Sequence, residues 1–131
     1  MKTILVVEGH AYARQFICRT LQRQGYNTLD AGSAEEAYYV LSRDPKINLV
    51  LSNFSIPGFN GFDLLRTIKN NPSLEDMPVV LLTTEYHTDK IRYASQSKMA
   101  SFIKMPFREE NLLSEIDRAI NTKGSIINVA A

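Results

Sequence analysis

The stretch NLVLSNFSIPGFNG, Asn48 to Gly61, decides how this sequence is interpreted. A short run of apolar and small residues leads into Asn53, and a Pro-Gly turn follows at Pro57. Such a run is typical of a strand that is covered on both faces, and the segment after the turn has a helical period. The pattern therefore places one side chain, an uncharged amide, at the carboxyl end of a buried strand.

The rest of the chain repeats this alternation of apolar runs and helical segments. Five strands are predicted, over residues 3–7, 27–31, 48–52, 78–83 and 100–104. Four helices are indicated by residues that share one helical face: Ala13, Phe16, Ile17 and Leu21; Ala34, Ala37, Tyr38 and Leu41; Gly61, Leu64, Leu65 and Ile68; Leu112, Leu113, Ile116 and Ile120. A fifth helix, the least firmly packed, is predicted over residues 88–97. Strands that alternate with helices through short loops predict a doubly wound α/β fold, a five-stranded parallel sheet with helices on both faces.

Two local signals support these boundaries. Ser33 precedes a helical run and Glu36 follows three residues later, which is the pattern of a capping box. Gly25 follows the first helical segment, where a glycine commonly ends a helix.

Length and composition favour one soluble domain. The chain has 131 residues, of which 44% are hydrophobic, enough for a single core over residues 1–122, and we expect residues 123–131 to form a disordered tail. Lys and Arg number 15 against 14 for Asp and Glu, a balance that argues against nucleic acid or a membrane surface as a partner. The single cysteine, Cys18, makes no internal disulfide and lies in an apolar helical stripe. With no stretch of membrane-spanning length, a cytoplasmic protein is expected.

In a doubly wound sheet, the functional crevice lies outside the carboxyl ends of the strands. The sequence places seven residues there: Glu8, Gly9, Asn53, Thr83, Thr84, Lys104 and Met105. These positions are distant in the sequence, and the fold makes them neighbours.

From residue 2 to about residue 121 the chain resembles the receiver domain of bacterial two-component response regulators, a CheY-like, flavodoxin-like fold. Four landmarks carry the resemblance, each in order and at a suitable spacing: ILVVEGHAYAR, LVLSNFSIPGFNG, MPVVLLTTE and SFIKMPF. The resemblance implies the strand order 2-1-3-4-5 and a signalling role.

The residues at the key positions depart from those of the family. Receivers typically carry an acidic pair after the first strand, an aspartate after the third, a hydroxyl after the fourth and a lysine before a proline after the fifth. In this sequence the acidic pair is Glu8 and Gly9, the phosphoacceptor position is Asn53, the hydroxyl is Thr83 and the lysine position is Met105. The resemblance is therefore to a degenerate receiver, or pseudo-receiver.

The chemistry of these departures predicts loss of phosphoryl transfer. An amide such as that of Asn53 is a poor nucleophile, and Glu8 alone leaves too little negative charge to strip water from Mg²⁺, so metal binding should be weak or absent. Met105 donates no hydrogen bond, and the neighbouring Lys104 points to the opposite face of the strand. We expect no enzymatic activity, no cofactor and no metal site; His10 and His87, on separate loops, make a poor metal set.

Other interpretations stay open at several positions. Asn53 is either a fixed mimic of aspartate or simply the residue of an Asx turn toward Ser55 and Ile56. Thr83 and Phe102 correspond to the family's switch pair, but a β-branched residue and an aromatic are also ordinary strand residues. The Glu8 carboxylate either pairs with Lys104 or Arg14 or is solvated, which is commoner for a loop acid.

The favoured function is a protein-interaction module in two-component signalling that works without phosphorylation, as a monomer or weak homodimer. The expected partner surface is the face formed by residues about 86–121, where an apolar and aromatic patch is possible: Tyr86, His87, Ile91, Tyr93, Phe102 and Met105. Core packing is the alternative for Ile91 and Phe102. The second hypothesis is a phosphorelay receiver with residual Mg²⁺-dependent activity or an unorthodox acceptor: Ser52, Ser55 or Thr84. A small-cofactor binder ranks last, because no phosphate loop follows the first strand.

Overall fold

The computed structural model describes residues 1–43, 46–57, 59–84, 100–122 and 129–130. Its strands are β1 (Thr3–Val7), β2 (Asn27–Ala31), β3 (Leu49–Asn53), β4 (Ser55–Ile56), β5 (Phe59–Asn60), β6 (Val79–Thr83), β7 (Ser101–Lys104) and β8 (Val129–Ala130). Its helices are α1 (Ala11–Arg23), α2 (Ala34–Arg43), α3 (Gly61–Lys69) and α5 (Glu109–Thr122). The five predicted strands are present within one residue of their expected bounds. The helix predicted over residues 88–97 lies outside the described residues.

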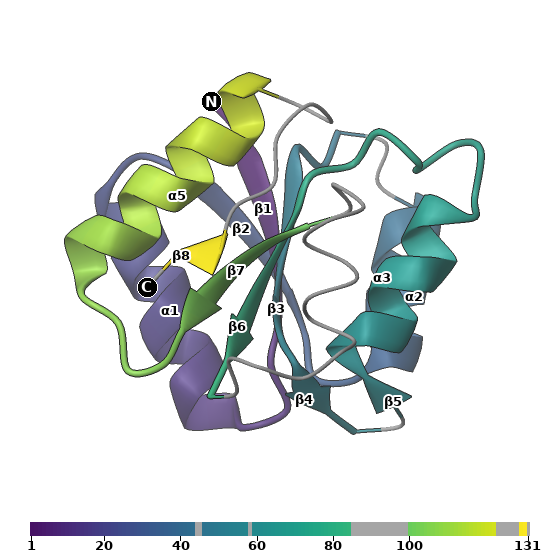
Figure 1. Cartoon of the computed structure of the whole chain (residues 1–131), viewed down its shortest axis with the longest axis horizontal. Helices are drawn as coiled ribbons and strands as arrows, with labels where there is room; N and C mark the ends of the chain where they lie inside the picture. Colours follow the sequence, from purple (N-terminus) through teal and green to yellow (C-terminus); the bar gives the residue numbers. More distant parts are fainter. Residues whose placement is uncertain (44–45, 58, 85–99, 123–128, 131) are drawn as a thin grey trace.

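The main sheet has the order β2-β1-β3-β6-β7-β8, and every neighbouring pair in it is parallel. When the separate hairpin strands β4 and β5 are left out of the numbering, β1, β2, β3, β6 and β7 have the order 2-1-3-4-5 that the resemblance implied. The carboxyl ends of β1, β3, β6 and β7 lie at the same edge of the sheet (Figure 1). The register of these strands therefore brings Glu8, Asn53, Thr83 and Lys104 to that edge. The predicted doubly wound fold is confirmed.

The sixth strand differs from the sequence prediction. We expected residues 123–131 to form a disordered tail, but Val129 and Ala130 pair with Phe102 and Ile103 of β7. Without a neighbour on that side, β7 would be an edge strand with unpaired backbone groups, and Val129 and Ala130 cover it at Phe102 and Ile103.

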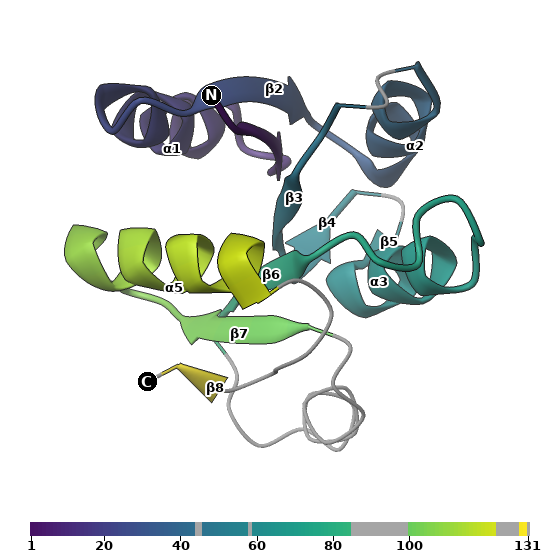
Figure 2. The same ribbon diagram turned by 90° about the horizontal axis from the view of Figure 1, so that it is seen from above.

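Helices cover both faces of the sheet, and each face has its own core. Figure 2 shows α1 and α5 on one side and α2 and α3 on the other. Residues of one strand alternate between the two: Val50 packs in the core under α2 and α3, whereas Leu49 and Leu51 pack in the core under α1 and α5. Two apolar cores explain why the strands are apolar at consecutive positions.

The helix ends follow the sequence signals. The Glu36 backbone N–H donates to Ser33 Oγ at 3.2 Å, while the Glu36 carboxylate accepts from the Gly32 N–H at 3.2 Å. Gly25 has a φ of 92°, a left-handed value that explains why a glycine follows α1. Asn60 caps α3, because its side chain accepts from the Asp63 N–H at 2.9 Å.

One core prediction is wrong. Phe16 was expected on the buried face of α1, but its side chain is 61% exposed. The buried face is formed by Ile17, Thr20 and Leu21, and Phe16 lies at its margin, one turn from the exposed Tyr12.

No helix in the described ranges is long and apolar enough to cross a membrane.

Candidate functional site

The crevice is built at the point where β1 and β3 end. Val7 is opposite Ser52 in the register of these strands, so Glu8 and Asn53, which come next, lie side by side. Asn53 Nδ2 donates to Glu8 Oε1 at 2.6 Å. The residues that the resemblance places at the phosphoacceptor position and at the first position of the acidic pair are thus bonded to each other.

Glu8 is not a solvated loop acid. Its side chain is buried, and its second oxygen accepts from the His10 backbone N–H at 2.8 Å. Each carboxylate oxygen therefore has a neutral donor, which offsets part of the cost of burying the charge. The expectation of a solvated Glu8 is wrong, and it failed because the sequence does not show that β3 supplies a donor.

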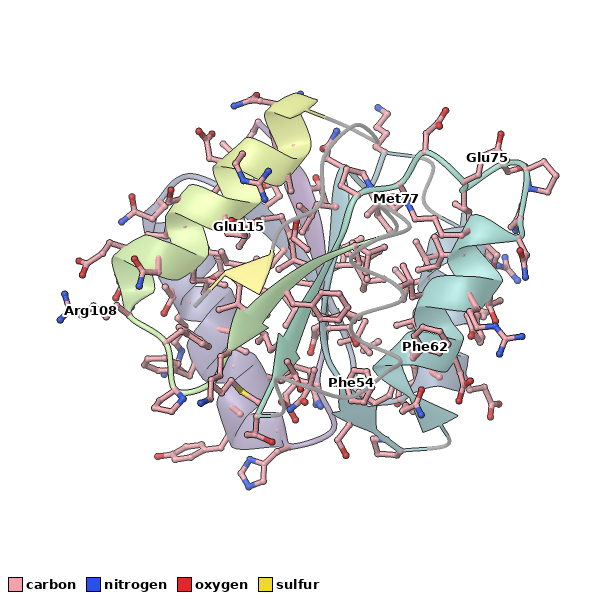
Figure 3. The ribbon with its side chains drawn as sticks, viewed as in Figure 1. Phe54, Phe62, Glu75, Met77, Arg108 and Glu115 are labelled. Atoms are coloured by element: carbon pink, nitrogen blue, oxygen red, sulfur yellow. The ribbon has the colours of Figure 1, made fainter. Side chains whose placement is uncertain are left out.

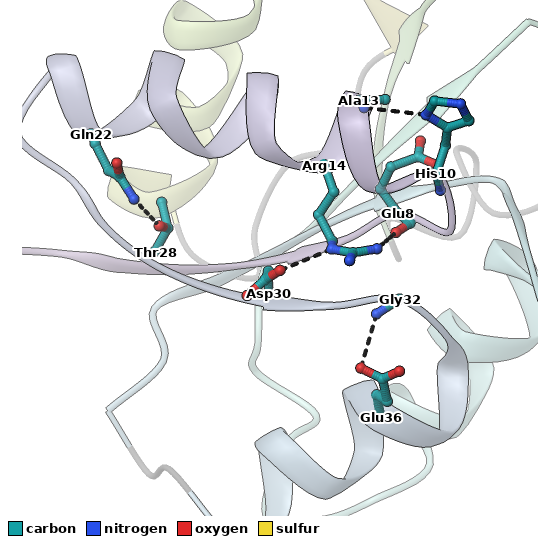
Figure 4. A network of polar contacts seen from close by, with 9 residues as sticks. All are labelled: Glu8, His10, Ala13, Arg14, Gln22, Thr28, Asp30, Gly32 and Glu36. Carbon is teal, nitrogen blue, oxygen red and sulfur yellow. Dashed lines mark hydrogen bonds and ion pairs between the residues drawn. The ribbon is translucent and has the colours of Figure 1, made fainter.

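Arg14 contacts Glu8, but through the backbone. Its Nη1 donates to the Glu8 carbonyl oxygen at 2.7 Å, while its Nε pairs with Asp30 Oδ2 at 2.8 Å (Figure 4). This arginine therefore ties the start of α1 to β2 and to the loop after β1. It fixes the position of Glu8 without contacting its carboxylate.

Both polar atoms of the Asn53 amide make hydrogen bonds. Its nitrogen faces Glu8, and Oδ1 accepts from the Ser55 N–H at 3.0 Å, which closes the Asx turn that was one of the two interpretations left open for this residue. The turn leads into a small antiparallel hairpin of β4 and β5, which the sequence did not indicate. An amide offers a donor to Glu8 and an acceptor to Ser55 at once, whereas an ionised carboxylate is acceptor-only.

Replacing Asn53 with Asp should therefore destabilise the fold in the absence of divalent ions. The change removes a donor to a buried carboxylate and brings a second negative oxygen close to it, so the free energy of unfolding should fall by about 1–3 kcal/mol. Urea denaturation with EDTA present would measure the loss. Asn53→Ser, which keeps a donor, should lose less; equal stability of Asn53→Asp and the parent would contradict the bond to Glu8.

Gly9 holds the second position of the acidic pair, and its surroundings explain why a glycine fits there. A Cβ atom built on Gly9 would lie 2.6 Å from Pro57 Cδ and 2.9 Å from Pro57 Cγ. The space that a side chain would need is filled by Pro57, in the turn between β4 and β5. Sequence reasoning identified Gly9 but missed Pro57, and the only available signal was a glycine directly after Glu8.

Thr83 and Phe102 are both buried, with exposed fractions of 2% and 0%. Phe102 packs in the core under α2 and α3 with Leu81 and Ala100. The core-packing interpretation of Phe102 is therefore correct, and the expectation that its ring contributes to a docking surface is wrong. Tyr86, His87, Ile91 and Tyr93 of the same expected patch lie outside the described residues.

Met105 follows β7 at the position of the family lysine. Its backbone N–H donates to the Thr83 carbonyl oxygen at 2.8 Å, and its side chain is partly buried against the core under α1 and α5. Ile103 packs in that same core, whereas Phe102 packs in the other, so side chains alternate along β7 as predicted. Lys104 lies between Ile103 and Met105, on the strand face opposite to theirs.

The remaining candidates are placed as follows. His10 caps α1, with its Nδ1 accepting from the Ala13 N–H at 3.4 Å, and the loop interpretation of this histidine is correct. Burial raises the pKa of the Cys18 thiol, with a smaller opposing contribution from a hydrogen bond to Thr28. Phe54 lies where β3 leads into the hairpin and Phe62 lies at the start of α3, and both pack in or against the core under α2 and α3 (Figure 3).

Comparisons with known proteins agree with this geometry. A family model described as the response regulator receiver domain matches residues 4–117. The phosphate regulon transcriptional regulatory protein PhoB of Pseudomonas aeruginosa is 28% identical over 123 residues, which make up 94% of this chain and 53% of that protein. The two-component response regulator ORR3 of rice (Oryza sativa) is 28% identical over 117 residues, 89% of either chain. This chain thus spans about half the length of the Pseudomonas protein.

Solved structures show the same fold. A response regulator receiver domain protein from Clostridium thermocellum superposes with a TM-score of 0.82 at 26% identity and covers 93% of this chain and 96% of its own. The chemotaxis protein CheY4 of Vibrio cholerae has a TM-score of 0.82 at 24% identity, covering 91% and 98%. With its sheet order, its crevice and a family match over most of its length, the chain belongs to the response regulator receiver domain family of two-component signalling.

Proposed function

We propose that this chain is a degenerate receiver, a non-enzymatic protein-interaction module that works in two-component signalling without aspartyl phosphorylation. The observation that carries the proposal is the 2.6 Å hydrogen bond from Asn53 Nδ2 to Glu8 Oε1. In a working receiver these positions hold the nucleophile and a metal ligand. Here an amide occupies the position of the nucleophile, and its nitrogen donates a hydrogen bond to the Glu8 carboxylate.

The loss of the nucleophile follows from the chemistry of the amide. An amide oxygen is neutral and a poor nucleophile, and Asn53 Oδ1 already accepts from the Ser55 N–H. At the lysine position, the Met105 thioether has no proton to donate to a phosphoryl oxygen. Attack and charge stabilisation are therefore both impaired.

The same residues fit Mg²⁺ poorly. This ion needs several oxygen ligands in near-octahedral geometry and gives up water reluctantly. The Asn53 N–H group points at the Glu8 oxygen that a metal would need, and Pro57 fills the space of a second acid at Gly9. We therefore propose no resident metal or cofactor in this crevice.

Incubation with acetyl phosphate and Mg²⁺ should leave the intact mass of the parent chain unchanged. Asn53→Asp restores the nucleophile and is the matched comparison, although Gly9 and Met105 still limit it. Gain of one phosphoryl group by the variant alone would support loss of the nucleophile as the cause. Gain of an acid-stable or acid-labile phosphoryl group by the parent would overturn the proposal.

The second candidate function is a receiver with an unorthodox phosphate acceptor, and the solvent exposure of the three possible acceptor side chains reduces their number. Ser52 is fully buried and donates to the Asn53 carbonyl oxygen at 2.9 Å, whereas Ser55 and Thr84 are exposed at the crevice. A phosphoryl group found on the parent should therefore map to Ser55 or Thr84. Fragmentation mass spectrometry of the modified chain would locate it.

The proposed partners are proteins of the cytoplasm. The near-equal counts of basic and acidic residues, 15 and 14, support neither a nucleic acid nor an anionic membrane as the main partner. A monomer or weak homodimer is the proposed state. The proposed partner surface is the face formed by residues about 86–121, to which the buried Phe102 contributes no exposed side chain and the partly buried Met105 contributes only part of one.

A further inference from the structure

A cavity of about 700 Å³ lies between the last turns of α2 and α3 and the segment that follows α3. Its inner surface is apolar and is formed by four side chains: Leu41, Ile68, Leu74 and Met77. Leu41 and Ile68 are buried, and Leu74 and Met77 are half-buried against the core under α2 and α3. This cavity, which we call the α2–α3 pocket, therefore offers a ligand an apolar surface that is continuous with the core.

The α2–α3 pocket lies at the end of the sheet opposite to the crevice. α2 and α3 follow β2 and β3 and run back along the sheet, so their last turns lie near the amino ends of the strands. Met77 comes just before β6 begins, and Figure 3 shows it at the far end of the molecule from Phe54, which follows β3. Binding in this pocket therefore requires no residue of the crevice and does not depend on whether the crevice accepts phosphate.

Polar groups without charge surround the opening of the α2–α3 pocket. They are four hydroxyl groups and one amide, from Tyr38, Ser42, Thr67, Asn71 and Ser73. The last four of these side chains are exposed, whereas Tyr38 is half-buried. Within the described part of the chain, no residue that lines the pocket is acidic or basic. A charged ligand would lose water there without gaining a counter-charge, so the lining favours a neutral ligand.

Hydrogen bonds hold the wall of the pocket that the segment after α3 forms. Lys69 Nζ donates to the Met77 carbonyl oxygen at 2.6 Å and to the Glu75 carbonyl oxygen at 3.2 Å. Asn71 Oδ1 accepts from the Ser73 N–H at 2.9 Å, which orients the Asn71 side chain and leaves its Nδ2 group to donate elsewhere. The pocket is therefore largely pre-formed, which reduces the entropy cost of binding.

We propose that the α2–α3 pocket is a binding site for a neutral small molecule with a flat apolar body and an amide or hydroxyl group at its edge. The body would pack on Leu41 and Ile68 and against the thioether of Met77, a soft group that makes favourable contacts with aromatic rings. The edge group would accept from Asn71 Nδ2 and donate to Ser73 Oγ. The volume of about 700 Å³ lies within the range of about 300–1,000 Å³ that is usual for small-molecule sites.

Titration of the full isotope-labelled chain with 2-naphthamide, followed through the backbone amide signals in NMR spectra, tests this site. The probe has a flat aromatic body and one neutral amide, and its matched control is 2-naphthoate, which has the same body and a carboxylate. 2-Naphthamide should shift the signals of Ser42, Thr67, Asn71 and Ser73 with a Kd of about 1 mM or lower, as expected for a ligand of about 13 non-hydrogen atoms. 2-Naphthoate should bind at least about tenfold more weakly, because its carboxylate finds no counter-charge.

Two substitutions should weaken the binding of 2-naphthamide. Ser42→Phe places a ring in the pocket and should raise the Kd about tenfold or more. Asn71→Asp keeps the acceptor for the Ser73 N–H but removes both donors, and it should also raise the Kd about tenfold. Ser114→Phe makes the first change at an exposed position of α5, on the other face of the sheet, and should alter the Kd less than about twofold. Thermal unfolding of each variant should match the parent, since the altered side chains are exposed.

Any of four results would overturn the proposal. The first is the absence of shifts at the signals of the pocket with about 2 mM 2-naphthamide. The second is equal binding of 2-naphthoate, which would exclude a neutral ligand class, and the third is an unchanged Kd in both Ser42→Phe and Asn71→Asp. The fourth is a set of shifts confined to Glu8 and Asn53, which would place the ligand in the crevice instead.

Discussion

Replacing Phe102 with alanine should lower the free energy of unfolding by about 3–5 kcal/mol, the usual cost of removing a fully buried aromatic ring. The ring has no solvent exposure and packs with Leu81 and Ala100 in the core under α2 and α3. β7, which carries it, pairs with both β6 and β8, so the backbone there has little freedom to collapse into the cavity. Urea denaturation followed by circular dichroism would measure the loss.

Phe16→Ala is the matched control, because it makes the same chemical change at a side chain that is 61% exposed. It should change the free energy of unfolding by less than about 0.5 kcal/mol. A loss below about 1 kcal/mol for Phe102→Ala would contradict the buried position of the ring. It would also reopen the hypothesis that Phe102 alternates between buried and exposed positions, as a switch residue would.

Gly9→Asp, the substitution that would restore the family's acidic pair, should destabilise the domain by about 2–4 kcal/mol. Overpacking against Pro57 accounts for about 1–3 kcal/mol of this loss, and a second carboxylate beside the buried Glu8 accounts for the remainder. The overpacking follows from the 2.6 Å and 2.9 Å separations between a Cβ atom on Gly9 and the Pro57 ring. Chemical denaturation with EDTA present would measure the total.

A double-mutant cycle separates the two contributions. Gly9→Ala introduces the Cβ atom without charge, and Pro57→Ala removes the ring that it would meet. Because Pro57 is exposed, Pro57→Ala alone should cost little, and it should recover at least about 1 kcal/mol of the loss caused by Gly9→Ala. Strict additivity of the two changes would show that the ring does not restrict position 9.

The predictions for Asn53→Asp and Gly9→Asp indicate what would restore the residues of a working receiver in the crevice. Asn53→Asp restores the nucleophile but leaves one acid, and adding the second at Gly9 requires the loop at Pro57 to move. The departures from the family pattern are therefore linked by packing as well as by chemistry. A triple change at positions 9, 53 and 57 is the smallest that we expect to recover strong Mg²⁺ binding.

The local pattern of the sequence predicted the strands, and the resemblance to receivers implied their order in the sheet. Runs such as TILVV and VVLLT are apolar at consecutive positions, and only a strand with cores on both faces makes use of that pattern. The caps at Ser33 and Gly25 were also predicted, and the Asx turn at Asn53 was one of two interpretations left open, because each depends on residues within a few positions of one another. The residues of the crevice were predicted as well, because each one lies at the carboxyl end of a strand that the local pattern identifies.

Tertiary structure alone decided the features that depend on residues distant in sequence. Glu8 is buried because Asn53, 45 positions later, donates to it; Gly9 has no room for a side chain because Pro57 fills the space. Phe16 is exposed because the core under α1 is filled by residues of four strands and α5, which helical periodicity does not describe. Local pattern fixes an element and its apolar side, whereas contact across the sheet fixes which side chains at the margin are buried.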